Sequence, residues 1–176
     1  RCIYERRAVR TYEDRPVPVE LVARIVDAGK MAPSAMNRQP WKFYLLTTPD
    51  TIRAFSREIA ACLEGRFHLA HGVDPGSSED PIFHGAPVVI FLTAPRDDEW
   101  AALDIGMCAE NMMLAAHSLG LATCPIGLAK FLDKTKIVSS LHLGASEQVI
   151  LAIALGYGSE MPERHQRVGD NVVFVG

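Results

Sequence analysis

The segment from Met31 to Leu46 constrains the fold more than any other stretch of this chain, because two prolines interrupt it. Pro33 and Pro40 fix φ and lack a backbone N–H, so neither a helix nor a central strand can continue through them. A helical pattern runs up to Ala32, and an alternating strand pattern begins at Trp41. The segment is therefore a helix-to-strand crossing of fixed shape. Its polar turn residues either bind a ligand or belong to a proline-stiffened connection beside a core tryptophan.

The bulk composition is that of an ordinary globular protein. The chain has 176 residues, of which 48% are hydrophobic, and we expect a single domain over residues 1–176. Its net charge of −3 gives no support for nucleic-acid binding, and no apolar run reaches the length of a transmembrane helix. We therefore expect neither a nucleic-acid nor a membrane partner. The 4 cysteines show no paired spacing, which favours a reducing cytoplasm.

Hydrophobic periodicity indicates an α+β fold, with one central mixed sheet and helices on both faces. Helices are predicted at 2–6, 18–32, 49–64, 100–119 and 129–142, and strands at 41–47, 87–94, 121–124, 149–155 and 172–175. Gly29 inside the second helix predicts a close contact with another helix or with backbone. The helix at 100–119 is apolar on most of its circumference, so we expect a second subunit to cover it.

Several motifs that would identify a site are absent. The sequence has no GxGxxG, P-loop or GxSxG pattern, which argues against a Rossmann dinucleotide site or a serine hydrolase. His68 and His71 form an HxxH without further convergent donors, so we expect no metal. Residues 66–86 read as irregular and as a candidate lid, and the part from His71 to Pro81 reads as an exposed loop.

The N-terminal arginines are the strongest candidate for chemistry. Arg6, Arg7 and Arg10 place three guanidinium groups within five residues, and Arg164 and Arg167 are candidates to converge on the same anion. Guanidinium forks match phosphate oxygens bidentately. Spacing alone leaves three readings open: an anion site, a solvated charged face, or a nucleic-acid arm.

An ordered set of motifs resembles the nitroreductase family of FMN enzymes over nearly the whole chain. The more specific part is Ala32-Pro-Ser-Ala-Met-Asn-Arg-Gln-Pro-Trp41. Around it lie Arg6-Arg-Ala-Val-Arg10, Pro16-Val-Pro18, Ala86-Pro-Val-Val-Ile90, Asp104-Ile-Gly106, Gly120 to Gly127 and Ala154-Leu-Gly-Tyr157.

This resemblance implies an intertwined homodimer of the nitroreductase-like fold, with a flavin at each subunit interface. The family pattern assigns the cofactor's phosphate and ribityl end to Arg6, Arg7, Arg10 and the backbone of Ala8, joined by Arg167 and less surely by Arg164. Pro33, Ser34 and Asn37 would approach the ring from the partner subunit, while Pro125, Ile126 and Gly127 would cover it. A backbone N–H near the flavin N5 would stabilise the reduced ring.

The activity implied is reduction of nitroaromatic or quinone-like acceptors by ping-pong hydride transfer from NADH or NADPH. No side chain is demanded as a catalytic acid or base. Ala8 stands where many members carry serine, and only residues 95–99 separate a strand from a helix where larger members insert a lid. Two alternatives remain: a specialised flavin enzyme (dehalogenase, dehydrogenase or flavin-modifying) and a flavin-binding protein without turnover.

Overall fold

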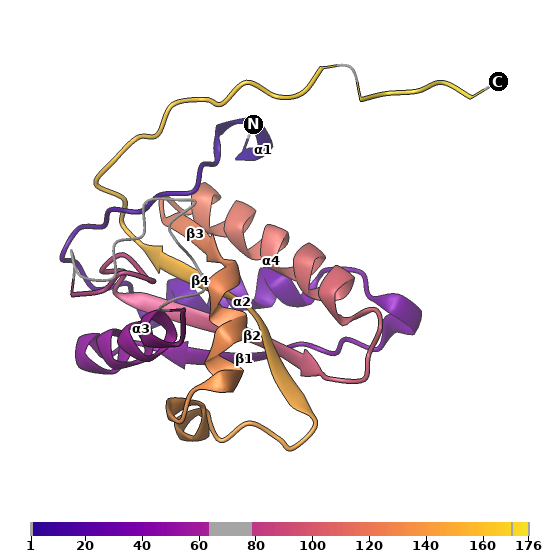
Figure 1. Cartoon of the computed structure of the whole chain (residues 1–176). Helices are drawn as coiled ribbons and strands as arrows, with labels where there is room; N and C mark the ends of the chain where they lie inside the picture. The colour runs from indigo at the N-terminus through magenta and orange to yellow at the C-terminus, as the bar shows by residue number, and fades with distance from the viewer. Residues whose placement is uncertain (1, 64–78, 170, 176) are drawn as a thin grey trace.

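Four antiparallel strands form the centre of this computed structural model, which describes residues 2–63, 79–169 and 171–175 (Figure 1). Their order across the sheet is β1-β2-β4-β3, and every neighbouring pair is antiparallel. The strands are β1 (Lys42–Leu46), β2 (Val88–Pro95), β3 (Ala122–Ile126) and β4 (Glu147–Gly156). The predicted α+β class is confirmed.

Helices cover both faces of the sheet (Figure 1). They are α1 (Cys2–Glu5), α2 (Val19–Lys30), α3 (Pro49–Leu63) and α4 (Ala101–Ser118), with 3₁₀ turns η1 (Ala35–Asn37), η2 (Gly127–Lys134) and η3 (Ile137–Leu141). The prediction of one helix over 129–142 is wrong. Thr135 takes an extended conformation, with φ −102° and ψ 159°, and separates η2 from η3.

The sheet lies between two layers of helices, and the alternation of side chains along β2 explains how both layers pack against it. Val88, Ile90 and Leu92 pack with α2 and α4 on one face, whereas Val89 and Phe91 pack with α3 and η2 on the other. Since both faces are covered, β2 is apolar along nearly its whole length. No helix among the described residues combines the length and apolarity needed to cross a bilayer.

The predicted strand at 172–175 is wrong. These residues are exposed and lie on a C-terminal arm that runs away from the sheet (Figure 1). Their β-branched side chains favour an extended backbone, but a strand also needs a partner edge, and no described residue pairs with them.

The close contact predicted at Gly29 is confirmed, and it lies between α2 and α4. A Cβ atom on Gly29 would stand 2.6 Å from Met112 Cγ and 3.0 Å from Cys108 Sγ. We expect Gly29→Ala to lower the free energy of unfolding by roughly 1–3 kcal/mol, because overpacking outweighs the gain in helix propensity. Urea unfolding checks this. A more stable Gly29→Ala protein would contradict the packing seen here.

Candidate functional site

The N-terminal segment is held against β3 by its backbone. Ala8 pairs in parallel with Thr123, and the Val9 N–H donates to the Thr123 carbonyl over 3.0 Å. The Tyr12 hydroxyl donates to the Val9 carbonyl at 2.8 Å, and burial strongly raises the pKa of this phenol. Gly158 permits the chain after β4 to lie close to Ala122 at the start of β3, because a Cβ on Gly158 would stand 2.9 Å from Ala122 Cβ.

Two isolated bridges define the course of the N-terminal segment. Ala8 pairs in parallel with Thr123 near the start of β3, and Tyr12 pairs antiparallel with Gly158, just after β4. Because the segment crosses from β3 to the end of β4 over these residues, the three arginines do not share one location.

Arg6 and Arg7 line one cavity of about 280 Å³, whereas Arg10 does not. Arg6 Nε lies 3.4 Å from Glu110 Oε1 on α4, and an Arg7 amino group donates to the carbonyls of Tyr4 (3.0 Å) and Arg6 (2.6 Å). The other lining residues are Glu5, Val9, His117, Gly120, Leu121, Ala122, Thr123, Gly158, Glu160, Met161 and Pro162.

This cavity fits the phosphate of a flavin mononucleotide. The Nε atoms of Arg6 and Arg7 are buried, and neither has a hydrogen-bond partner among the described residues. A buried donor without an acceptor costs about 1–3 kcal/mol. Phosphate oxygens accept strong, charge-assisted hydrogen bonds from guanidinium groups. The donor set therefore suits a phosphorylated ligand, and Arg6 and Arg7 would hold it.

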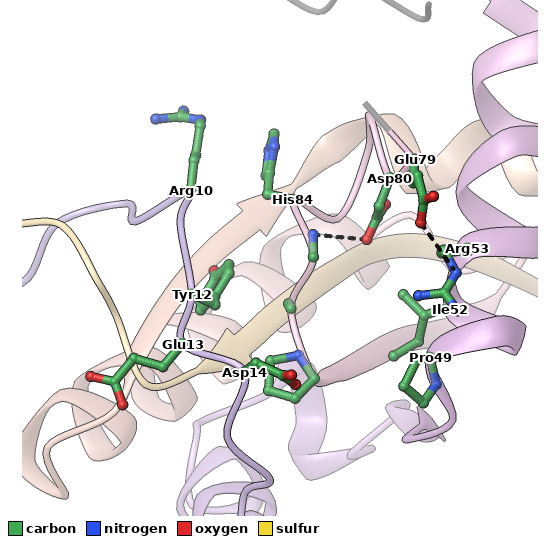
Figure 2. Close-up of a pocket in the computed structure, with 13 residues that line it drawn as sticks. Arg10, Tyr12, Glu13, Asp14, Pro49, Ile52, Arg53, Glu79, Asp80 and His84 are labelled. Atoms are coloured by element: carbon green, nitrogen blue, oxygen red, sulfur yellow. Dashed lines mark hydrogen bonds and ion pairs between the residues drawn. The ribbon is translucent and has the colours of Figure 1, made fainter. Parts of the chain in front are cut away.

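Arg10 lines a second cavity, of about 590 Å³, together with His84 (Figure 2). The two side chains project in the same direction from neighbouring backbone segments (Figure 2). The opposite wall carries Arg53, which pairs with Asp50 at 2.5 Å and with Glu79 at 4.0 Å. Arg10 is exposed and is the basic side chain nearest to His84 in this view (Figure 2).

His84 lies on a constrained turn. Its φ is 61°, in the left-handed region that non-glycine residues rarely adopt. Asp80 stabilises the turn by accepting the N–H groups of Phe83 and Gly85, each at 2.9 Å. Burial, and then the charge of Arg10, lowers the pKa of His84, so its imidazole is neutral at pH 7.

The turn that carries Pro33, Ser34 and Asn37 is exposed or half-exposed at the other end of α4. Ser34 Oγ accepts the Gln39 N–H at 2.9 Å, and Asn37 Oδ1 accepts from the Gln39 side chain at 3.1 Å. Asn37 itself has a φ of 55°. The polar side chains thus stabilise the turn, as the sequence predicted.

Asp104 fixes this turn to α4. Its side chain is 1% exposed, and both carboxylate oxygens accept the Ala35 N–H, at 3.1 and 3.3 Å. Sequence reasoning assigned Asp104 no role. A signal was available, since an acidic residue in the first turn of an otherwise apolar helix needs a buried partner.

We expect Asp104→Ala to lower the free energy of unfolding by about 1–3 kcal/mol, because the Ala35 N–H loses its acceptor and α4 loses a favourable first-turn charge. Asp104→Asn keeps an oxygen acceptor and should lose less. Urea unfolding measures both, with Asp27→Ala on the exposed side of α2 as the control. Equal stability of Asp104→Ala and the parent would contradict this role.

The end of β3 presents backbone to solvent. Pro125 and Gly127 are exposed, Ile126 is buried, and a Cβ at Gly127 would meet nothing within 4 Å. Pro125 has no N–H and lies in an edge strand, where a proline is tolerated. A flat ligand can therefore approach the backbone closely at this point.

The structure does not bring Arg164 and Arg167 to the N-terminal arginines. Both are exposed on the C-terminal arm, and neither side chain makes an ion pair with a described residue. Met161 and Pro162, at the root of that arm, do line the cavity of Arg6 and Arg7. His68, His71 and the candidate lid up to residue 78 lie outside the described residues. Asp80 and Pro81, which were predicted to belong to an exposed loop, are buried, so that part of the prediction is wrong.

Within one chain, the turn of Pro33, Ser34 and Asn37 lies far from the cavity of Arg6 and Arg7. The turn at Ala35 lies at the start of α4, while His117 in the cavity of Arg6 and Arg7 lies at its end (Figure 1). At 1.5 Å per residue, Asp104 and His117 are about 20 Å apart along the helix axis.

Comparisons with known proteins agree on one family. The profile of the nitroreductase family matches residues 3–157. A 4-nitrobenzoate reductase of Pseudomonas putida is 29% identical, over 90% of this chain and 84% of its own. A nitroreductase of Bacteroides fragilis, solved with bound FMN, has a TM-score of 0.87 at 23% identity, covering 99% of this chain and 97% of that one. An FMN- and NADPH-dependent nitroreductase, NfnB, of Sphigopyxis sp. strain HMH has a TM-score of 0.79 at 24% identity, with 99% and 97% covered.

Proposed function

We propose that this chain, which belongs to the nitroreductase family, is an FMN-dependent oxidoreductase that uses NADH or NADPH to reduce nitroaromatic or quinone-like acceptors. The observation that carries the proposal is the cavity beside β3, where the buried Nε atoms of Arg6 and Arg7 have no hydrogen-bond partner among the described residues, and Arg6 Nε has only the ion pair with Glu110 at 3.4 Å. The names of relatives support the same activity, since they include a 4-nitrobenzoate reductase and an FMN- and NADPH-dependent nitroreductase.

FMN, when bound, supplies hydride transfer between the nicotinamide and the acceptor. The chain's own residues then have separate tasks along β3. Arg6 and Arg7 hold the phosphate. The backbone of Ala8 pairs with Thr123 and so fixes where the phosphate end of the flavin lies relative to β3. Arg10 lines a different cavity, so its positive charge would act on the bound flavin from outside the phosphate site. The exposed backbone at Pro125, Ile126 and Gly127 lets the ring approach without side-chain obstruction.

The site is proposed to be completed by a second copy of the chain. Pro33, Ser34 and Asn37 lie about 20 Å from the cavity of Arg6 and Arg7, measured along α4. A two-fold axis beside α4 would bring the turn of one chain toward the arginines of the other. The outward side of α4 supports such a contact, because Leu103 is 56% exposed and Gly106, Met107 and Leu114 follow it on the same stripe. Arg164 and Arg167 would reach an anion only through movement of the arm.

Purified protein tests the activity. Yellow protein that oxidises NADH or NADPH faster when 4-nitrobenzoate or a quinone is added supports the proposal. Yellow protein that is inert to both nicotinamides supports a flavin-binding protein without turnover. Turnover with a reductant but with neither class of acceptor supports a specialised flavin reaction. Colourless protein that takes up no added FMN contradicts all three. The free thiols of Cys2, Cys62, Cys108 and Cys124 agree with the cytoplasm as the proposed compartment.

A further inference from the structure

His117 is a basic side chain in the cavity of Arg6 and Arg7 that no motif singled out. It lies in the last turn of α4 and is half-buried, and its imidazole makes no hydrogen bond to a described residue. The segment from Gly120 to Thr123, which follows it, forms the floor of the same cavity. The register of Ala8 with Thr123 places this floor at the end of β3 remote from the exposed backbone at Gly127.

Charge balance shows why a third basic group matters here. Arg6 and Arg7 contribute two positive charges to the lining, and Glu5 and Glu160 contribute two negative charges, so their formal sum is zero. Glu160 Oε1 accepts the Arg10 backbone N–H, and Glu110 on α4 further offsets Arg6. His117 is the remaining basic side chain of the lining, so it adds a hydrogen-bond donor where the arginines are already offset. The other elements that line it, from Gly120 to Thr123 and from Met161 to Pro162, carry no ionisable side chain.

We infer that His117 is a third phosphate-binding side chain, which helps the protein to select FMN over riboflavin. The inference rests on the proposed function, because it requires the phosphate to occupy this cavity. An imidazole N–H donates a hydrogen bond, and phosphate oxygens are strong acceptors.

The test is the ratio of the dissociation constants for riboflavin and FMN, measured with apo-protein at one fixed pH. We expect His117→Gln to reduce this preference for FMN about fivefold. Comparing each variant with the parent at the same pH cancels the titration of the FMN phosphate itself. His117→Arg, which keeps a basic donor at this position, should retain the preference. Ser118→Ala, on the exposed neighbour, is the control.

Arg6→Ala separates failure of this inference from failure of the proposed function. If Arg6→Ala reduces the preference for FMN and His117→Gln does not change it, the role of His117 is overturned while the phosphate site stands. If neither substitution changes the preference, the phosphate does not lie in this cavity and both proposals fall. If His117→Gln weakens FMN and riboflavin equally and His117→Arg does not restore the preference, His117 is only structural and the inference is overturned.

Discussion

Replacing Arg6 with alanine is expected to weaken FMN binding by about 100-fold and to leave riboflavin binding nearly unchanged. Each hydrogen bond to a charged group is worth about 1.5–3 kcal/mol, and 1.4 kcal/mol corresponds to a factor of ten. Arg6 is suited to this role because its Nε is buried without a hydrogen-bond partner among the described residues and its side chain is 22% exposed. Titration of apo-protein with each flavin, followed by flavin fluorescence, measures the effect.

Two further substitutions make the Arg6 result specific. Lys134→Ala, on the exposed side of η2, removes a positive charge remote from the cavity and should change neither affinity. Arg10→Ala should weaken both flavins to a similar extent, because Arg10 lies outside the cavity of Arg6 and Arg7 that would hold the phosphate. Equal losses for Arg6→Ala and Lys134→Ala would contradict the phosphate role.

Introducing a charge at Leu103 is expected to convert a dimer into monomers and to remove bound FMN with it. Leu103 is 56% exposed on a stripe of α4 that also carries Met107 and Leu114. Burying a carboxylate without a partner in an apolar interface costs several kcal/mol, so Leu103→Asp should dissociate the dimer at micromolar concentration. Sedimentation velocity, recorded at the protein and flavin absorption bands, measures both results at once.

Leu45→Asp is the matched control for Leu103→Asp. Leu45 is 42% exposed on edge strand β1, away from α4, and the substitution introduces the same charge in place of the same side chain. It should leave the dimer and its flavin intact. A Leu103→Asp protein that stays dimeric and yellow would show that α4 does not form the interface.

Much of the fold could be predicted from local patterns. The continuous apolar run that forms β2 indicated a central strand, and Pro33 with Pro40 placed the crossing between α2 and β1 correctly. The close contact at Gly29 followed from the presence of a costly glycine in a helix. Each of these features depends on residues near one another in the sequence.

The errors came from features that depend on distant partners. Residues 172–175 have strand-forming side chains but no edge to pair with among the described residues. Residues 129–142 have a helical pattern, yet the extended backbone at Thr135 divides them. β3 can continue through Pro125 because β3 is an edge strand, where a proline is tolerated. The sequence does not reveal which strand lies at the edge.

The candidate site was predictable in composition and not in geometry. The arginines and the Pro33 turn could be identified, but their spacing could not show that Arg10 faces a different cavity from Arg6 and Arg7. That division follows from the course of the segment, which pairs with Thr123 at Ala8 and with Gly158 at Tyr12. The roles of Asp104 and His117 also required long-range contacts.

Mixing two defective variants tests the shared site most directly. One is Arg6→Ala, and the other carries Ser34→Asp with Asn37→Asp, which keeps the turn's hydrogen-bonding chemistry but repels an anionic cofactor. After joint unfolding and refolding at equal amounts, random pairing should leave about a quarter of all sites intact, since half the dimers are mixed and each has one complete site. FMN bound per chain, measured by ultrafiltration, is predicted to rise to that level from nearly zero in either variant alone. Absence of any recovery in the mixture, with both parents folded, would contradict a site built from two chains.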